Sequence, residues 1–288
     1  MPLVLGQFRF YPRTWINKWF THRRFMGALR LKPDRMEPAE LHARLQLLRE
    51  KTWPSMLQAP VGRRLLVIAP HPDDETIACG GLLLAHRGLA EVHVVNIFSG
   101  AAQDNRDYGS TRSQELHAAA RLLGCASVRQ LDFDDGAEVA TEAAAERLRE
   151  AVEEIQPDVV LLPWLFDGHR DHRMTNVLYA WGCADLPCMV LGYEVWSLCP
   201  PNAVFDITHL LEEKLQVLQE YRSQAAINDY DHLVRGMAAV RGFEFSKQPK
   251  RAGAAEAFLS MPGNDYASMV RSVYGQPGAL SACGRSLL

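Results

Sequence analysis

Short apolar runs and longer amphipathic stretches alternate along the chain from residue 63 onward. The apolar runs predict buried strands, and the stretches between them, where apolar residues recur every three or four positions, predict helices. The predicted strands are 65–69, 92–98, 128–133, 159–162, 189–196 and 204–207, and the predicted helices are 76–87, 110–123, 141–155, 172–183 and 210–222. Because strands that alternate with helices form parallel sheets covered on both faces, we expect an α/β fold of Rossmann-like type with a mainly parallel sheet.

The first 58 residues have a different character. Between Gln7 and Arg35, eight lysines and arginines stand against one acidic residue, and seven aromatic residues are interleaved with them. Trp15, Ile16 and Trp19 have the spacing of one helix face, and the pattern predicts a second helix after them. We therefore expect residues 1–58 to form a basic, aromatic, helical N-terminal extension, followed by one domain over residues 59–288.

The sequence leaves three interpretations of this extension open. Its helices could pack on the main domain as a cap. Residues 8–32 could instead make a peripheral membrane contact, with aromatic side chains in the headgroup region and basic ones against anionic lipid. The extension could also contact a second copy of the chain, so a homo-oligomer stays open.

Composition narrows the class of protein. The 288 residues are 48% hydrophobic and 23% charged, as in ordinary globular proteins, and the net charge of -3 gives no reason to expect nucleic-acid binding. No run approaches the roughly 20 apolar residues that span a bilayer, and no signal peptide is recognisable. Six scattered cysteines without a C-x-x-C pair suit reduced thiols. We expect a cytoplasmic location, with the inner face of the membrane as the place of any peripheral contact.

Two clusters of histidines and carboxylates follow two of the predicted strands. The segment 69–75 reads Ala-Pro-His-Pro-Asp-Asp-Glu and comes directly after the apolar run that ends at Ile68. The segment 167–172 reads Asp-Gly-His-Arg-Asp-His and follows the apolar run that ends at Pro163. Charged groups are rarely buried unless they are paired or bind a metal, and open α/β sheets place their ligands at strand ends. The two clusters therefore predict one metal site.

The residue types favour a catalytic zinc site. His71, Asp74 and His172 can supply two imidazoles and one carboxylate, which leaves a position open for water on a single Zn²⁺. Zinc lowers the pKa of bound water to about 7 and polarises a carbonyl oxygen. Asp73 should point away from the ion and act as the general base, and His169 could stabilise a developing oxyanion.

Asp171 could hydrogen-bond one of these imidazoles and set its tautomer. Either cluster alone could instead cap a helix or stabilise a loop. Glu75 could simply interact with the positive N-terminus of the next helix. The Gly80-Gly81 pair is not a dinucleotide fingerprint and is expected to allow close packing of a helix on the sheet.

These residues resemble the PIG-L/LmbE-like zinc N-deacetylases over roughly residues 63–260. The family's opening motif corresponds to residues 69–75, and its second motif corresponds to residues 169–172. Between them, residues 111–116 resemble the family's Arg-x-x-Glu helix, and the segments 193–196 and 221–224 resemble later parts. The resemblance implies an LmbE-like form of the predicted fold for residues 59–288.

The resemblance also implies roles. His71, Asp74 and His172 would be zinc ligands and Asp73 the base, while His169 would stabilise the oxyanion with Asp171 behind it. The residues implied to contact substrate are Arg112, Glu194, Trp196 and Gln224. For Arg112 the alternative is a surface pair with the acidic residue three positions later, and for the other three it is a role in the scaffold.

Together with the two clusters, the resemblance implies a zinc-dependent hydrolase that removes the N-acetyl group from an N-acetylglucosamine-type sugar or glycoconjugate, including a lipid-linked one, by attack of metal-activated water. A second hypothesis is an amidase or deacetylase of a glucosaminyl thiol conjugate or a glycosylated natural product. A third, from another class, is a membrane-associated binding protein with an inactive site. Loops that the pattern does not describe decide among the substrates.

Overall fold

The predicted α/β fold with a mainly parallel sheet is confirmed. A computed structural model describes residues 40, 54–101, 106–137, 141–245 and 253–275, and within these residues one eight-stranded sheet has the order β1-β7-β8-β6-β5-β2-β3-β4. All neighbouring strands are parallel except β8, which is antiparallel to β6 and β7. The strands are β1 (Ser55–Met56), β2 (Arg64–Ala69), β3 (Glu91–Phe98), β4 (Ser127–Phe133), β5 (Val159–Pro163), β6 (Met189–Tyr193), β7 (Ala203–Asp206) and β8 (Ala255–Pro262).

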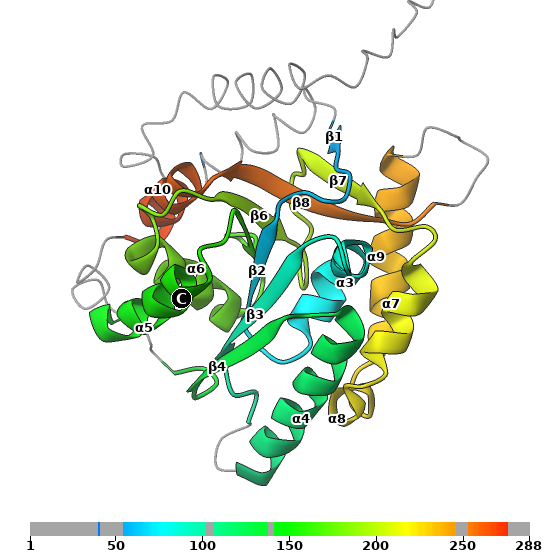
Figure 1. Ribbon diagram of the computed structural model, residues 1–288, viewed down its shortest axis with the longest axis horizontal. Coiled ribbons are helices and arrows are strands. Elements are labelled where there is room, and N and C mark those ends of the chain that lie inside the picture. The colour runs from blue at the N-terminus through cyan, green and yellow to red at the C-terminus, as the bar shows by residue number, and fades with distance from the viewer. Residues whose placement is uncertain (1–39, 41–53, 102–105, 138–140, 246–252, 276–288) are drawn as a thin grey trace, which may run out of the picture.

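Helices cover both faces of this sheet (Figure 1). They are α3 (Asp74–His86), α4 (Arg106–Leu123), α5 (Glu142–Ile155), α6 (Arg170–Gly182), α7 (Leu211–Leu218), α8 (Arg222–Ala225), α9 (Tyr230–Phe245) and α10 (Gly263–Tyr274). Side chains of β2 alternate between the two faces. Leu66 and Ile68 pack with α5, α6 and α10, whereas Leu65 and Val67 pack with α3, α4, α7 and α9. This alternation explains why the strand reads as a continuous apolar run.

The glycine pair in α3 permits the close packing that the sequence suggested. A Cβ atom on Gly81 would lie 2.4 Å from Cγ2 of Ile207, which follows β7. The backbone N–H groups of Gly81 and Leu82 each donate to the carboxylate of Glu256 in β8, at 2.8 Å. Lys214 of α7 pairs with the same carboxylate at 2.7 Å, so this buried charge is both paired and hydrogen-bonded.

The chain changes direction across the sheet between β2 and β5. From β2 it continues outward to β3 and β4, and it then returns to place β5 on the other side of β2. Loops that follow two such strands diverge and leave a crevice at their carboxyl ends, where open α/β sheets bind ligands. The first histidine cluster follows β2 and the second follows β5, so the topology brings both clusters to this crevice.

Some elements differ from the sequence prediction. The single helix predicted over 210–222 is two helices, α7 and α8, because the backbone at Tyr221 leaves the helical region (φ -82°, ψ 57°). The elements β1, α9, β8 and α10 were not predicted. Most of residues 1–58, including 8–32, and the last dozen residues lie outside the described part of the chain. Ser55 and Met56 form β1 within the sheet, and the division at residue 58 stays a prediction.

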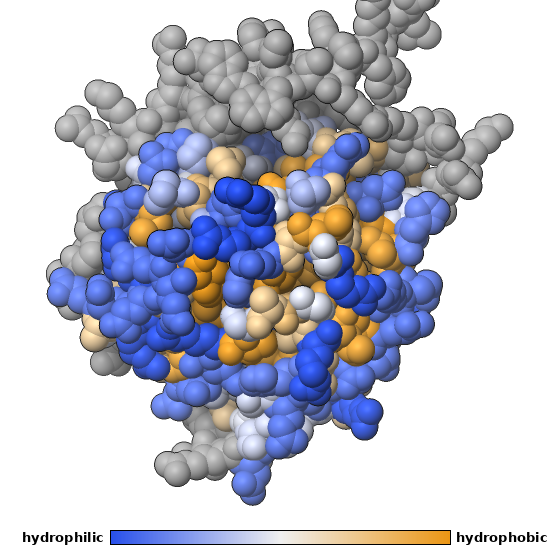
Figure 2. Space-filling view, in the orientation of Figure 1, coloured by the Kyte–Doolittle hydropathy of each residue, from blue (hydrophilic) through white to orange (hydrophobic). Residues whose placement is uncertain are grey.

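The described surface is of mixed polarity. Hydrophilic residues cover most of the face in Figure 2, with apolar residues gathered toward its middle. No helix within the described residues is long and apolar enough to cross a membrane. The five cysteines of the described residues are free thiols, as the sequence predicted for them.

Candidate active site

The loop between β2 and α3 places three polar side chains at the crevice. His71 donates its backbone N–H to Oδ2 of Asp74 at 2.9 Å, which closes a tight turn at the start of α3. Asp73 has φ 131° and ψ -30°, a conformation that costs a non-glycine residue of order 1–3 kcal/mol. Such strain persists only where surrounding contacts enforce it, and it is concentrated at functional sites.

The Asp74 carboxylate lies between two imidazoles. Its Oδ2 atom is 3.4 Å from Nδ1 of His71 and 3.2 Å from Nε2 of His172. Burial opposes the charge, but the neighbouring His172 and His71 hold the pKa of Asp74 well below its usual range. The three predicted ligands therefore converge on one point from both loops, with the carboxylate ionised as a metal ligand must be.

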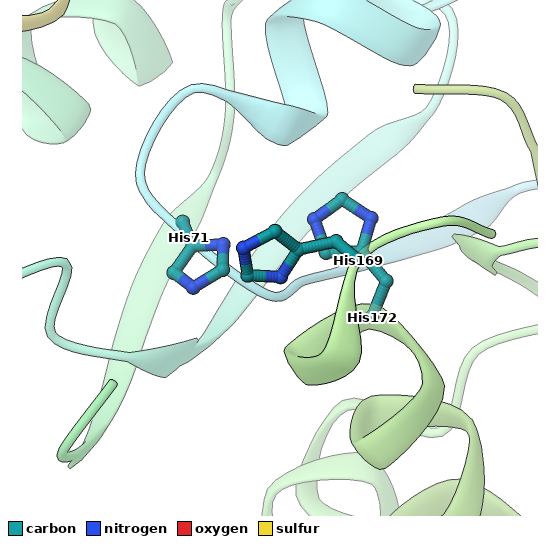
Figure 3. Close-up of side chains that lie close together, drawn as sticks. All are labelled: His71, His169 and His172. Carbon is teal, nitrogen blue, oxygen red and sulfur yellow. The ribbon is translucent and has the colours of Figure 1, made fainter. Parts of the chain in front are cut away.

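The histidine rings form one cluster, and Figure 3 shows them facing one another from the β2–α3 loop and the start of α6. Nitrogen atoms of His71, His169 and His172 all lie within 4.8 Å of one another, so these three residues could also hold a metal ion. His169 is the N-cap of α6, and its Nδ1 accepts the N–H of Asp171 at 3.2 Å. A neutral His169 then carries its proton on Nε2, which suits it to donate a hydrogen bond more than to bind a cation.

Electrostatics separate His169 from the other two rings. Burial, together with the nearby His71 and His172, lowers the pKa of His169. For His71, burial acts in the same direction, but Asp171 and Asp74 overcome it and raise the pKa of His71 to about 10. For His172, Asp74 and Asp167 likewise overcome burial and raise its pKa to about 9. The carboxylates around the two predicted ligands, His71 and His172, therefore favour positive charge at this position.

His172 has the features of a metal ligand. It is fully buried, and neither of its ring nitrogens makes a hydrogen bond of good geometry within the described residues. Oδ1 of Asp167 lies 3.1 Å from its Nδ1 and would orient the ring, as a carboxylate behind a metal-binding histidine does. Asp167 also accepts the N–H groups of His169 and Trp196, so it joins the loop after β5 to the loop after β6. Sequence reasoning gave this aspartate no role.

The Asp171 carboxylate contacts His71, across the cluster from the expected position behind His169. Its Oδ2 atom lies 3.0 Å from Nε2 of His71 and accepts the N–H of Gly136 at 3.1 Å. Because Nε2 of His71 faces this carboxylate, Nδ1 is the nitrogen that faces Asp74. Asp171 thus orients His71 through its carboxylate and His169 through its backbone.

Asp73 lies beside Arg112 and apart from the histidine cluster. Nη2 of Arg112 donates to Oδ2 of Asp73 at 3.0 Å and to the carbonyl of Pro72 at 2.5 Å, and Nη1 donates to the carbonyl of Gly100 at 3.2 Å. Burial and the neighbouring charge of Asp74 raise the pKa of Asp73 to about 8, against the opposing effect of Arg112. A carboxylate whose pKa lies near neutrality can both accept and return a proton.

A cavity of about 820 Å³ opens over these groups. It is lined by His71, Asp73, Asp74, Arg112, Asp135, Gly136, His169, Arg170, Asp171, Trp196, Gln224, Asn228 and Tyr230. Three of the four residues expected to contact substrate, namely Arg112, Trp196 and Gln224, are therefore brought to it. Trp196 is 47% exposed and packs edge-on against Tyr230, with ring centroids 6.4 Å apart.

Glu194 is not brought into this cavity. Its carboxylate is buried and accepts hydrogen bonds from the guanidinium of Arg241 and from the N–H of Cys199 at 2.6 Å. This position is a correction to the expected substrate contact, since both carboxylate oxygens are used by the scaffold. Asp135 is a cavity residue that the sequence analysis missed, although it stands two residues after a predicted strand, where the other site residues also occur.

Comparison with known proteins places this site in a family. Residues 66–180 match the family model described as PIG-L, GlcNAc-PI de-N-acetylase, and the match contains both histidine clusters. This segment of the chain matches the PIG-L family. This matches the predicted family and the predicted class of enzyme, a deacetylase among the hydrolases.

Relatives of this chain include several deacetylases. The diacetylchitobiose deacetylase of Thermococcus kodakarensis is 27% identical over 187 residues, which are 56% of this chain and 70% of the relative. The 2′-N-acetylparomamine deacetylase of Streptomyces fradiae is 32% identical over 175 residues, which are 52% of this chain and 63% of the relative. Among solved structures, N,N′-diacetylchitobiose deacetylase from Pyrococcus horikoshii has a TM-score of 0.62 at 24% identity, covering 77% of this chain and 91% of that one, and shares the fold.

Proposed function

We propose that this chain is a zinc-dependent N-deacetylase that hydrolyses the acetamide of an N-acetylglucosamine-type sugar or glycoconjugate and releases acetate and a free amine. The observation that carries the proposal is that the two adjacent aspartates at the crevice have different neighbours. Asp74 lies between His71 and His172, while Asp73 is held apart by Arg112 and remains open to the same cavity. One carboxylate thus serves binding and its neighbour serves proton transfer.

A divalent cation fits the donor set of His71, Asp74 and His172. The buried ring nitrogens of His172 without hydrogen bonds, and the Asp74 oxygen shared by two imidazoles, are the features that support this choice. When bound there, zinc would supply Lewis acidity that polarises the acetyl carbonyl and acidifies water. Asp167 and Asp171 would orient the two histidines from behind.

Asp73 is the general base of the proposed reaction. It takes a proton from the attacking water while Arg112 holds its carboxylate in place at 3.0 Å. When the tetrahedral intermediate collapses, Asp73 gives this proton to the departing nitrogen. His169 donates a hydrogen bond from Nε2 to the acetyl oxygen as negative charge develops there.

The remaining cavity residues suit a sugar. Asp135, Gln224 and Asn228 offer hydrogen-bonding groups at the wall, and the half-exposed Trp196 offers a flat apolar surface at the rim. Relatives named for diacetylchitobiose, 2′-N-acetylparomamine and N-acetyl-α-D-glucosaminyl L-malate support an N-acetylated amino sugar as the common part. They differ in what is attached to that sugar.

Amine release tests the proposal. The purified chain, analysed for bound metal, is incubated with a panel that contains N,N′-diacetylchitobiose, N-acetylglucosaminyl malate and a lipid-linked N-acetylglucosaminide. We expect primary amine and acetate in equal amounts from at least one member, loss of activity on removal of metal by a chelator, and recovery on addition of zinc. Binding of these sugars without any turnover by metal-loaded protein would instead support the binding-protein hypothesis.

A further inference from the structure

The backbone of Asp73 is held in its strained conformation without the usual help of its own side chain. Asp73 is the N-cap of α3, where an aspartate ordinarily accepts a backbone N–H of the first helical turn. It makes no such bond, and its carboxylate instead meets Arg112 at 3.0 Å beside the cavity. Other groups must therefore hold the turn at φ 131°, and the bond from the N–H of His71 to Asp74 closes only the part before Asp73.

Glu75 supplies one such contact. Its Oε2 atom accepts the backbone N–H of Asp73 at 3.2 Å. The arrangement resembles a capping box, in which an acidic side chain of the first turn accepts the N–H of the N-cap residue. Because Glu75 is 0% exposed, water does not compete for this carboxylate.

The other carboxylate oxygen of Glu75 is fixed by two hydroxyl groups. Oε1 accepts hydrogen bonds from Oγ1 of Thr76, at 2.5 Å, and from the hydroxyl of Tyr221. Tyr221 is fully buried and lies at the turn between α7 and α8, far along the chain from Glu75. The carboxylate cannot rotate away from Asp73 without losing these donors.

The segment that carries Tyr221 is itself tied to the helix that carries Arg112. Ser223 donates its backbone N–H to Glu115 at 2.8 Å and its hydroxyl to the same carboxylate at 2.6 Å. Glu115 lies in α4, less than one helical turn from Arg112, which donates to Asp73. α3 therefore holds the backbone of Asp73 through Glu75, and α4 holds its carboxylate through Arg112.

We propose that Glu75 and Tyr221 are positioning residues, which hold Asp73 in the conformation that keeps its carboxylate at the cavity. The inference rests on the proposed function, in which Asp73 is the base. A plain helix-capping role for Glu75 would affect only the stability of the fold. A positioning role predicts a loss of turnover as well, with substrate binding retained.

Two substitutions of Glu75 separate these roles. Glu75→Gln keeps an amide oxygen that can accept the N–H of Asp73, whereas Glu75→Leu fills the same space without an acceptor. We expect Glu75→Leu to lower kcat about 100-fold, as small misplacements of reacting groups do, with KM changed less than about threefold. Glu75→Gln should recover most of this loss. Equal kcat values for the two variants would overturn the proposal.

Tyr221→Phe provides a milder test that keeps the fold. It removes one hydroxyl donor to Glu75, and we expect kcat to fall about tenfold, well within the range that misplacement can produce. The matched control is Tyr179→Phe, which removes another buried tyrosine hydroxyl, bonded to Cys188 before the start of β6 and away from the site. An equal fall in kcat for both variants, or a fall matched by loss of bound metal, would contradict the proposal.

Crystal structures of the variants test the positioning role of Glu75 without an activity assay. In Glu75→Leu, Asp73 should leave its positive φ, and its carboxylate should turn to cap α3. A Glu75→Leu structure in which Asp73 keeps φ near 131° would overturn the positioning role. If the wild-type chain released no amine from any sugar, the proposed function would fail, and this structural comparison would still show whether Glu75 holds Asp73.

Discussion

At the residue scale, two adjacent aspartates have opposite electrostatic settings. Asp74 lies between His71 and His172 and stays ionised, whereas burial and the charge of Asp74 raise the pKa of Asp73 to about 8. Pairs of titratable groups whose surroundings push their pKa values apart identify acid and base roles in enzymes. The sequence shows the pair but not the difference, because only the fold brings Arg112 to one aspartate and the imidazoles to the other.

Asp73→Asn should abolish most of the turnover and leave the metal in place. An amide cannot accept the proton of water, and general base catalysis contributes about 10²–10⁴-fold, so we expect kcat to fall by about 10³-fold. Amine release and metal content are measured on the same sample. Asp132→Asn is the control, since Asp132 is exposed and asparagine tolerates its φ of 52°. Wild-type turnover in metal-loaded Asp73→Asn would assign the base elsewhere.

Asp167→Ala should weaken metal binding without touching a ligand. Asp167 lies 3.1 Å from Nδ1 of His172, and loss of such a carboxylate typically lowers metal affinity about 10–100-fold. Competition with a chromophoric chelator measures the affinity directly. Asp158→Ala serves as the control, because Asp158 accepts the backbone N–H groups of Arg63 and Arg64 at the amino ends of β2 and β5, whereas the site lies beyond the carboxyl ends of these strands. Unchanged affinity in Asp167→Ala would remove His172 from the ligand set.

The sequence predicted that the two histidine clusters meet, and the fold brings them together, whereas the contacts that the sequence did not reveal have physical causes. His71, Asp74 and His172 could be proposed because they follow apolar strands in short clusters. Asp135 gives the same signal after β4 but stands without a histidine, so it was not distinguished from a loop residue. Glu194 was misassigned because its partner, Arg241, is 47 residues away and only the fold shows that they meet.

At the scale of the elements, the pair of Glu194 and Arg241 joins α9 to the loop after β6. Both side chains are buried, and Arg241 also donates to the carbonyl of Cys199 at 2.9 Å. This loop also carries Trp196, which lines the cavity, so the ion pair holds the loop that forms one wall of the cavity. Breaking a buried pair leaves a charge without a partner, which is far more costly than losing an exposed pair.

Arg241→Met should therefore destabilise the fold strongly. We expect the free energy of unfolding to fall by about 3–5 kcal/mol in urea titrations. Arg235→Met is the control, because Arg235 is 44% exposed in its pairs with Glu212 and Asp231, and loss of such exposed pairs should change the free energy of unfolding far less. Similar small losses in both variants, with a raised KM for Arg241→Met, would return Glu194 and Arg241 to a role in substrate binding.

The sequence predicted the parallel strands β2 to β7, but it predicted neither the two-residue β1 nor the antiparallel β8. Leu65–Ala69 and Val159–Leu162 are continuous apolar runs because both faces of β2 and β5 are covered. β8 contains Glu256, and a buried carboxylate contradicts the pattern of a strand until its partners are known. Those partners are Lys214 and the N–H groups of α3, which only the tertiary structure brings together.

At the scale of the whole molecule, the site lies where two loops leave a sheet that is packed on both faces. The scaffold holds buried histidines whose positive charge the surrounding carboxylates favour. Without metal, the pKa of His71 is about 10 and that of His172 about 9, both above the ordinary value of 6.5. Their contribution to stability is complete below pH 6.5 and is lost as pH rises toward 9 and 10. Asp73, with its pKa raised to about 8, acts in the same direction.

The metal-free protein should accordingly become less stable between pH 6.5 and 9. We expect its melting temperature to fall by about 5 °C or more over this range, measured by calorimetry or circular dichroism. Zinc-loaded protein should show a smaller fall, because the cation takes the place of the protons beside the carboxylates. A His172→Gln variant should also show a shallower dependence. A melting temperature of the metal-free protein that rises toward pH 9 would contradict these charge states.

The most direct test of the central claim is a crystal structure of the zinc-loaded protein with anomalous scattering at the zinc edge. The account predicts one ion per chain, bound by Nδ1 of His71, a carboxylate oxygen of Asp74 and Nε2 of His172, at about 2.0–2.2 Å. Asp73 and His169 should lie beside the ion without binding it. An ion bound by His169 in place of Asp74, or no ion at this crevice, would contradict the account.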